Sequence, residues 1–345
     1  MKTLHIYSNR HIKDKVKTIK KGDWIYLENS FSKKRWSLYF RANNINEKEL
    51  NITYITQEEF FNLSLEEENK FDNVVGNQPY HYKKPGHDKS TMIWHLFIPK
   101  AFDIVKTNGT VSLINPPLWR KPDGVAKIAN KVLFSKQLLD ISCHSFEEGY
   151  ETFGAGTAYD SWTAKNCDPT ELTNVRFQDG EIAKVDLTST NFMPSGYYSE
   201  IKSLITDNVE ERVNFIFSRS GYGSDKPNMS IEKTDKFSNP CVYTITKNKI
   251  NLWYSDTAKN GHFDIPKVIW TNGSGTRPIV DNDGEYGVMQ FGYAIADDPE
   301  NLENIAKALA SEKMKKLMSC NLFTNGIYNN TIIKMFKKDF WKEFV

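Results

Sequence analysis

Residues 71–80, Phe-Asp-Asn-Val-Val-Gly-Asn-Gln-Pro-Tyr, combine the pattern of a buried strand with side chains suited to holding a planar amine. The apolar run ends in Gly-Asn, a proline and an aromatic ring, which predicts a strand that delivers a polar loop to its carboxyl end. In open α/β sheets, ligands bind at that end. The Asn77 carbonyl can accept one amino hydrogen, the main-chain carbonyl of Gln78 can accept the other, and the Tyr80 ring can stack on the ligand. An amine held in this way turns its nitrogen lone pair outward, towards an electrophile.

This segment resembles the Asn-Pro-Pro-Tyr signature of adenine-specific DNA methyltransferases in the TaqI-like group of restriction-modification methylases, and the likeness covers most of the chain. Gln78 stands where the family has its first proline, and Pro79 is retained. The acceptor needed there is a main-chain carbonyl, so the change removes stiffness more than chemistry. The resemblance implies that Asn77, Gln78, Pro79 and Tyr80 hold a flipped adenine while its 6-amino group is methylated by S-adenosylmethionine, without a metal. The alternative is a strand-to-turn corner with a hydrogen-bonded Asn, which any α/β protein can contain.

A second candidate corner is Asn115-Pro116-Pro117-Leu118-Trp119-Arg120. It matches the signature except that Leu118 stands where a stacking ring is needed and Trp119 comes one place late. In TaqI-like methylases the strand after the catalytic helix also ends in a proline-containing turn. We therefore assign the catalytic corner to Asn77 and interpret residues 115–120 as its neighbour.

The segment 153–162, Phe-Gly-Ala-Gly-Thr-Ala-Tyr-Asp-Ser-Trp, contains two glycines that could be mistaken for a cofactor loop. Alternating residues after Thr157 predict a strand, whereas a cofactor loop should lead into a helix. The segment is similar to the post-catalytic hairpin of the methylase family, whose aromatic residue helps to hold the extruded base. Phe153 is the candidate for that second stacking face, and a plain core aromatic is the alternative.

The N-terminus predicts a βαβ unit with a strand at 4–7, a helix over 10–20 and a strand at 24–27. Glu28 ends the second strand, where an acid often takes the cofactor ribose hydroxyls, although an exposed strand-end Glu is the alternative. The first loop, residues 8–11, has no glycine, so the family's Phe-x-Gly-x-Gly pattern is missing. Either the cofactor binds through an altered loop or it does not bind in this chain.

The resemblance implies a Rossmann-like class I methyltransferase sheet over residues 1–194 and a mixed α/β target-recognition domain over 195–345. Further elements of the first domain are expected as strands at 52–55, 111–114 and 141–144, helices over 92–105 and 126–139, and a hairpin of 175–177 with 182–185. Residues 81–89 form a polar segment of the kind that could order on DNA.

Beyond residue 195 the chain alternates strand signals with polar loops, and a helix is expected over 301–318. This half resembles the target-recognition domain of TaqI-like methylases. Side chains suited to phosphates and base edges are Arg219, Lys226, Asn272, Arg277 and Lys334. Each of them, taken alone, could equally be a solvated surface residue.

Composition sets limits on the class of protein. A chain of 345 residues, 39% hydrophobic and 13% aromatic, predicts two globular domains. The sequence shows no apolar run of 18 residues and no apolar core segment at the N-terminus, so neither a membrane span nor a signal peptide is expected, and the cytoplasm is the default location. The four cysteines are scattered, which argues against a zinc site and favours reduced thiols.

The formal charge of +2 does not by itself indicate a nucleic-acid binder. The charge is unevenly distributed, because residues 1–41 carry eleven Lys and Arg against three acids, and residues 43–72 carry eight acids against two Lys. The basic stretch is either a solvated face or a phosphate-binding surface.

Three functions remain open. The first is methyl transfer to adenine in double-stranded DNA. The second is a non-catalytic, methyltransferase-derived DNA-recognition subunit that works beside a catalytic or restriction partner, which the glycine-free loop favours. The third is methylation of another planar nitrogen, in RNA or in a protein glutamine, because the corner around Asn77 would present any amide or amine equally well.

Overall fold

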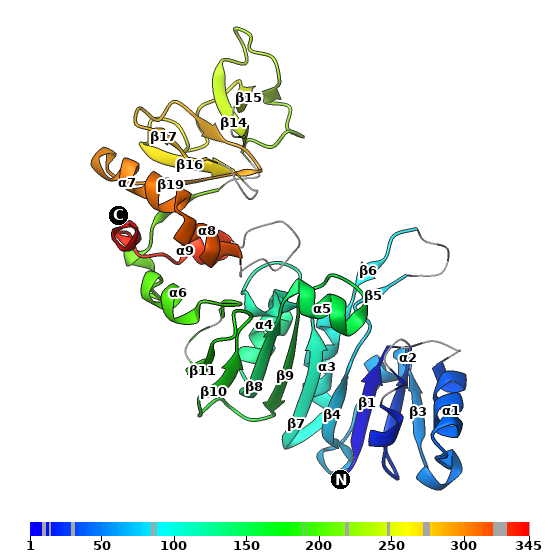
Figure 1. Cartoon of the computed structure of the whole chain (residues 1–345). Coiled ribbons are helices and arrows are strands. Elements are labelled where there is room, and N and C mark those ends of the chain that lie inside the picture. The colour runs from blue at the N-terminus through cyan, green and yellow to red at the C-terminus, as the bar shows by residue number, and fades with distance from the viewer. Residues whose placement is uncertain are drawn as a thin grey trace. The chain divides into compact units, whose positions relative to one another are not determined.

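The computed structural model describes the chain except for residues 9–11, 14, 29–31, 84–85, 87, 189, 191, 218–220, 247–248, 272–276, 320–329 and 345 (Figure 1). The chain divides into two compact units, Met1–Met193 and Pro194–Val345, called here the first and the second unit. In the part of the chain that the structure describes, no helix is both long enough and apolar enough to cross a bilayer.

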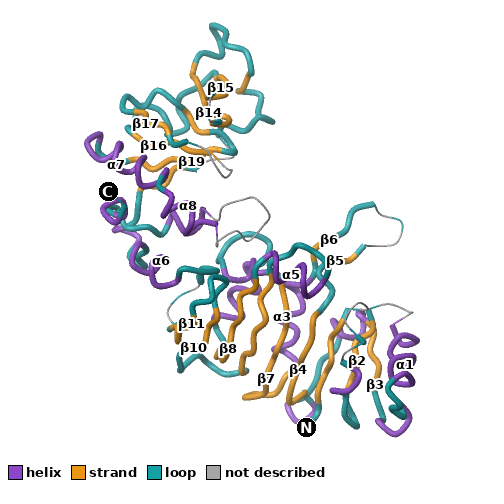
Figure 2. The backbone as a smooth tube through the Cα atoms, in the orientation of Figure 1, coloured by secondary structure: helices purple, strands orange, loops and turns teal. Residues whose placement is uncertain are grey.

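The first unit is built on one mixed sheet, with the described strands in the order β11-β10-β8-β9-β7-β4-β1-β2-β3 (Figure 2). Neighbouring strands are parallel except that β9 runs antiparallel to β7 and β8, and β11 runs antiparallel to β10. The predicted α/β fold with a mainly parallel sheet is confirmed. The strands are β1 Thr3–Tyr7, β2 Trp24–Leu27, β3 Thr53–Thr56, β4 Phe71–Asn77, β7 Val105–Asn115, β8 Gln137–His144, β9 Tyr159–Lys165, β10 Thr173–Arg176 and β11 Ile182–Val185.

The two faces of this sheet differ in polarity. One face is buried, because α3 (Trp94–Ile104) packs against β7, α4 (Lys127–Phe134) packs against β8, and Phe102 of α3 stacks on Trp162 of β9. Figure 1 shows both helices behind the sheet. The other face carries half-buried hydroxyl side chains that bond to one another across strands, such as Ser112 and Thr163 at 2.9 Å. This hydroxyl face is defined by Ser112, Ser142, Ser161 and Thr163. The helices of the unit are α1 Ser32–Ala42, α2 Gln57–Asn62, α3 Trp94–Ile104, α4 Lys127–Phe134 and α5 Phe146–Phe153.

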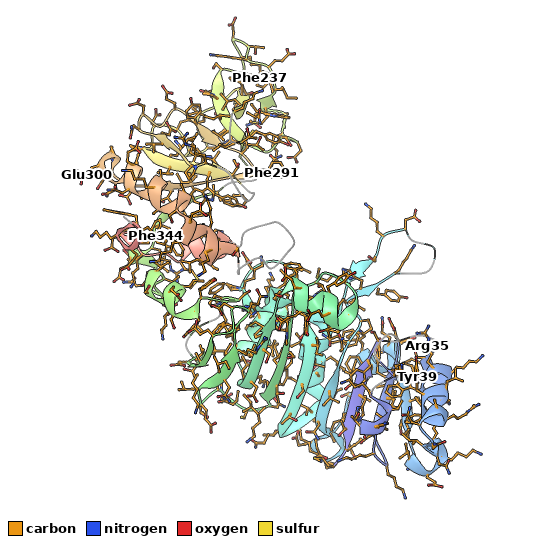
Figure 3. All side chains as sticks on the ribbon, viewed as in Figure 1. Arg35, Tyr39, Phe237, Phe291, Glu300 and Phe344 are labelled. Atoms are coloured by element: carbon orange, nitrogen blue, oxygen red, sulfur yellow. The ribbon has the colours of Figure 1, made fainter. Side chains whose placement is uncertain are left out.

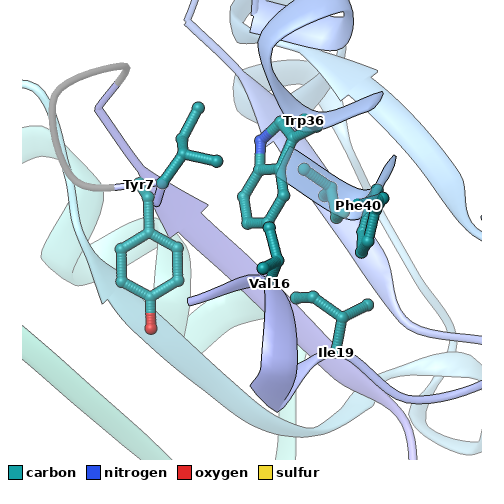
Figure 4. Close-up of a cluster of buried hydrophobic side chains, with 7 residues drawn as sticks. Tyr7, Val16, Ile19, Trp36 and Phe40 are labelled. Carbon is teal, nitrogen blue, oxygen red and sulfur yellow. The ribbon is translucent and has the colours of Figure 1, made fainter. Parts of the chain in front are cut away.

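The helix expected over residues 10–20 is wrong for the described part of that range, which contains only a 3-10 turn, Val16–Thr18. Its apolar residues are nevertheless buried with Trp36 and Phe40 of α1 (Figure 4). Lysines four apart, at 13 and 17 and at 17 and 21, repel each other along a helix. The side chains of Ile12, Val16 and Ile19 are therefore buried by a short turn instead of a helix.

Other predicted boundaries shift for local reasons. The helix expected over 126–139 ends at Phe134, and the Gln137 side chain starts β8 by accepting from the main-chain N–H groups of Thr170 and Glu171. The helix expected over 301–318 divides into α7 Pro299–Ala310 and α8 Glu312–Ser319, because the Ser311 hydroxyl caps the second helix at the Met314 N–H. The polar segment after the Asn77 corner contains a small hairpin of β5 His81–Tyr82 and β6 Thr91–Met92.

The second unit contains two four-stranded sheets, β12-β19-β16-β17 and β13-β15-β14-β18, among its described residues. Their common core includes Val242, Ile269 and Val288. Lys267 and Asp281 form a buried ion pair at 2.6 Å, in which burial lowers the pKa of the lysine and the carboxylate opposes that shift. The elements are β12 Asn214–Ile216, β13 Met229–Ser230, β14 Asn239–Ile245, β15 Ile250–Ser255, β16 Lys267–Thr271, β17 Ile279–Asp281, β18 Gly287–Val288, β19 Gly292–Ala296, α6 Tyr198–Leu204, α7, α8 and α9 Asn330–Lys334.

Candidate functional site

Asn77 is the last residue of β4, at the carboxyl end of a strand held between β1 and β7. Its main-chain carbonyl accepts a hydrogen bond from the Ser8 N–H at 3.0 Å. The preceding residue has to be glycine, because a Cβ on Gly76 would lie 1.8 Å from the Ile6 carbonyl oxygen. The corner is thus fixed to the neighbouring strand by its backbone. The Asn77 side chain is 4% exposed and makes no hydrogen bond with any other described residue.

A cavity of about 560 Å³ opens beside this corner, over the hydroxyl face of the sheet. Its lining includes Asn77 from β4, Tyr7 and Lys15 from the N-terminal segment, and Phe153 from the end of α5. The volume falls within the roughly 300–1,000 Å³ of small-molecule sites. The structure therefore brings Asn77 and Phe153, two residues 76 positions apart, to one cavity.

Phe153 belongs to a helix, and the expectation that it lies on a hairpin is wrong. Helix α5 begins at a capping box in which the Ser145 hydroxyl accepts from the Glu148 N–H and the Glu148 carboxylate accepts from the Ser145 N–H. It ends at Gly154, which adopts the left-handed conformation with φ of 67°. The Phe153 ring packs edge-on against Tyr159 at 4.8 Å between centroids. The sequence signal for this helix was Ser145 followed three residues later by Glu.

Residues 78–80, which complete the corner, are buried or half-buried, whereas a ring that stacks on a base has to expose one face. Gln78 is 1% exposed, and neither polar atom of its side chain has a partner among the described residues. Pro79 is buried and Tyr80 is half-buried. The Tyr80 hydroxyl is likewise buried without a partner in the described chain, and its pKa is raised by burial and by the nearby Asp160 carboxylate. Tyr80 is absent from the cavity lining, so its pairing with Phe153 around a base stays a prediction.

The corner at Asn115 has a structural role. The Asn115 carbonyl oxygen accepts from the Trp162 indole N–H at 2.6 Å, within a fully buried environment. Arg120 donates from Nε to Asp160 at 2.8 Å, and both side chains are 0% exposed. Burial raises the pKa of Asp160, and the Arg120 guanidinium opposes that shift. Asn115 is 0% exposed and does not line the cavity, and its Nδ2 is buried without a partner in the described chain, so its side chain is closed off from a ligand in this arrangement. This favours Asn77 as the candidate.

Glu28 directly follows β2 and is half-buried at the carboxyl edge of the sheet. It does not line the cavity, so its contact with a cofactor ribose stays a prediction. Of the glycine-free first loop, only Ser8 lies within the described residues.

The groups that line the cavity fit the chemistry of S-adenosylmethionine, the cofactor that the family resemblance implies. Lys15 offers an ammonium group for a carboxylate, and the floor offers hydroxyl groups from Ser112 and Thr163. Burial raises the pKa of the Tyr7 phenol to about 12, so this hydroxyl remains a neutral donor. Sequence reasoning missed these residues, although the polar alternation along β7 and β9 was a signal for an uncovered sheet face.

Three of the five residues predicted to bind DNA lie within the described part of the second unit. Arg219 and Asn272 lie outside the described residues. Lys226 is half-buried, 3.7 Å from the Asp225 carboxylate, which partly neutralises it. Arg277 is exposed. Their role in DNA binding stays a prediction.

Lys334 is the best-placed of these candidates. It is exposed, and its ammonium lies 5.4 Å from the Phe215 ring centroid and 5.9 Å from that of Phe217. Phe217 is 40% exposed and stacks on Tyr293 at 5.1 Å. Another exposed ring of this unit, Phe291, is labelled in Figure 3. Aromatic faces beside a cation are a combination found where proteins contact nucleobases and phosphates.

Metal chemistry has no candidate ligand set in the described chain, where no group of three or more His, Cys, Asp or Glu side chains could hold an ion. Cys143, Cys167 and Cys241 are free thiols, and Cys320 lies outside the described residues.

Comparisons with known proteins bear on this site. Residues 5–153 match the family of Eco57I restriction-modification methylases, and no curated protein matches the chain. Similar solved structures include a putative class I S-adenosylmethionine-dependent methyltransferase from Listeria monocytogenes, with 12% identity, a TM-score of 0.38, and coverage of 51% of this chain and 58% of that one. Another is a type I restriction-modification methyltransferase subunit from Streptococcus thermophilus, with 11% identity, a TM-score of 0.37, and coverage of 55% and 46%.

A third is a modification subunit of a putative type I restriction enzyme from Vibrio vulnificus, with 11% identity, a TM-score of 0.37, and coverage of 59% and 48%. The chain thus spans less than two thirds of the length of each of these proteins. The matched residues 5–153 contain the Asn77 corner and end at Phe153. The expected resemblance to restriction-modification methylases is confirmed, because residues 5–153 match the model of the Eco57I restriction-modification methylase family.

Proposed function

We propose that the chain transfers a methyl group from S-adenosylmethionine to the 6-amino group of a flipped adenine in duplex DNA. The observation that carries the proposal is the Asn77 side chain, which is almost fully buried beside a ligand-sized cavity and has no hydrogen-bond partner among the described residues. Because this amide faces the cavity and no described side chain bonds to it, its carbonyl can accept and its NH2 group can donate a hydrogen bond to a ligand. The match of residues 5–153 to a restriction-modification methylase family supports a chemical class for that ligand.

In this proposal the protein acts mainly by positioning. The Asn77 carbonyl and the main-chain carbonyl of Gln78 accept the two amino hydrogens of the base, which directs the nitrogen lone pair at the electrophile. Bound cofactor supplies an activated methyl group. As the new N–C bond forms and the S–C bond breaks, the two carbonyls stabilise the positive charge that develops on the nitrogen, and one proton is then lost to solvent. Phe153 and Tyr80 are proposed to limit the space around the base.

Duplex DNA is the proposed macromolecular partner. Its support in the second unit is the exposed Lys334 beside the Phe217 ring, and Arg277, Lys226, Arg219 and Asn272 are proposed as further contacts. A catalytic or restriction subunit is a further proposed partner. We place the protein in the cytoplasm, where such a substrate would be met.

A non-catalytic DNA-recognition subunit is the second candidate function. It is favoured by the glycine-free first loop and by Gln78, which departs from the family signature. Calorimetric titration of the whole chain with S-adenosylmethionine separates the two. Heat of binding at micromolar ligand supports the enzyme, whereas a folded, DNA-binding protein that gives no heat at millimolar ligand supports the recognition subunit.

The test of the site is Asn77→Ala, assayed by transfer of labelled methyl groups to DNA from a methylation-free host. Loss of the amide carbonyl should reduce transfer by about 100-fold or more, the cost of removing one donor or acceptor aimed at a developing charge. DNA binding should stay within a few-fold of wild type. The matched control is Asn62→Ala, an exposed Asn at the end of α2 that does not line the cavity. Normal turnover by Asn77→Ala would remove Asn77 from the proposal.

A further inference from the structure

Lys15 is the lysine in the lining of the cavity beside Asn77. Its side chain is half-buried at one end of the cavity, with Nζ 5.9 Å from the Tyr7 ring centroid. No carboxylate among the described residues pairs with it. Two other partly buried lysines of the first unit do have such partners, Lys106 with Asp72 at 2.9 Å and Lys70 with Glu67 at 3.1 Å. Lys136 has none in the described chain and lies over the Phe102 ring, but it does not line the cavity. An ammonium group that is partly removed from water and unpaired favours an anionic ligand.

The position of Lys15 places that anion close to the Asn77 corner. Tyr7, which Lys15 overlies, is paired in register with Asn77 across β1 and β4. The carboxylate group in the cavity lining belongs to Asp140 on β8, and β9, β7 and β4 separate that strand from β1 in the sheet. A ligand anion is therefore attracted to the end of the cavity at Tyr7 and repelled from the end at Asp140.

We propose that the Lys15 ammonium binds the carboxylate of the amino-acid end of S-adenosylmethionine, in place of the main-chain donors that a glycine-rich loop provides. The inference rests on the proposed function. Glycines in such a loop let the backbone approach a ligand closely. Residues 8–11 contain none, and a long lysine side chain reaches an anion without close backbone approach. Lys15 thus gives the altered loop a way to bind the cofactor.

The Lys15 ammonium could bind a phosphate of DNA as well as the carboxylate of the cofactor, because both are anions. The test therefore has to separate these two ligands. We would titrate the whole chain by calorimetry with S-adenosylmethionine, S-adenosylhomocysteine and 5′-methylthioadenosine, which lacks the amino-acid end. Lys15→Gln should weaken binding of the first two ligands by about 10-fold, the worth of one charge-assisted hydrogen bond. Binding of methylthioadenosine should stay unchanged. Lys15→Arg should bind more like wild type than Lys15→Gln does.

The matched control is Lys17→Gln, an exposed lysine on the same turn that does not line the cavity, and it should bind all three ligands as wild type does. Equal binding of all three ligands by wild type and Lys15→Gln would overturn the assignment of Lys15 alone. Unchanged cofactor binding together with weaker, less salt-dependent duplex binding would assign Lys15 to a DNA phosphate. A wild-type chain that binds none of the three ligands would end the proposed function, and this inference with it.

Discussion

Two corners of one sheet, at Asn77 and at Asn115, have similar sequences and different structures. They end the adjacent parallel strands β4 and β7, and each has an Asn followed closely by proline. Asn115 is followed by two prolines, as in the family signature, yet its carbonyl is occupied by Trp162. Asn77 matches the signature less well at its second position, but it lines the cavity and its side chain makes no hydrogen bond with a described residue. Asn115 is 0% exposed, does not line the cavity, and has its Nδ2 buried without a partner among the described residues. An amide that faces a ligand-sized cavity is thus a better guide to a binding site than the number of matching letters.

The largest expected effect concerns the buried ion pair behind the Asn115 corner. Arg120→Ala leaves the Asp160 carboxylate buried without its guanidinium, which should lower the free energy of unfolding by about 3–5 kcal/mol. Urea unfolding, followed by circular dichroism, measures the change. Replacing both members, as Arg120→Met with Asp160→Leu, should cost less than the single change, because no charge is then left alone. A loss below about 1 kcal/mol for Arg120→Ala would mean that this corner is not structural.

An intermediate effect is expected when the two asparagines are each replaced by alanine. Asn115→Ala leaves the buried Trp162 indole N–H without its acceptor, which should cost about 1–3 kcal/mol in the free energy of unfolding. Asn77→Ala breaks no hydrogen bond within the described chain and should cost less than about 1 kcal/mol. Urea unfolding of the two variants side by side tests the difference. Equal losses would show that Asn77 also supports the fold, and methyl transfer by Asn77→Ala would then have to be judged against its stability.

The sequence predicted the strand pattern well where burial alone determines it. β1 and β2 lie at or within one residue of their expected positions, and β4 ends at the Asn77 corner as predicted, because their short apolar runs favour buried strands. The 3-10 turn at Val16–Thr18 and the break at Ser311 were missed, because repulsion between lysines and a capping hydroxyl decide them. Both effects act on a single turn of the chain and do not alter the spacing of the apolar residues, so a prediction from that spacing does not detect them.

The candidate site was predictable only in part. Asn77 was identified from its motif, but the cavity beside it depends on which residues the sheet brings together across strands. Ser112 meets Thr163 only through the antiparallel pairing of β7 with β9, a register that no local pattern specifies. Lys15 was one of many lysines in a basic stretch until the fold placed it over Tyr7. Phe153 was identified, although on the wrong kind of element, since the capping box at Ser145 was not recognised.

The smallest expected effect comes from making the Asn77 corner resemble the family signature more closely. Gln78→Pro removes two buried polar atoms that have no partner in the described chain and restricts the unfolded backbone. The free energy of unfolding should rise by about 0.5–1 kcal/mol, and methyl transfer should stay within a few-fold of wild type, because the proposed acceptor at this position is the main-chain carbonyl, which proline keeps. Gln78→Ala is the control for loss of the side chain without the stiffer backbone. A large loss of transfer in both variants would mean that the Gln78 amide itself contacts the substrate, and that the departure from the signature is functional.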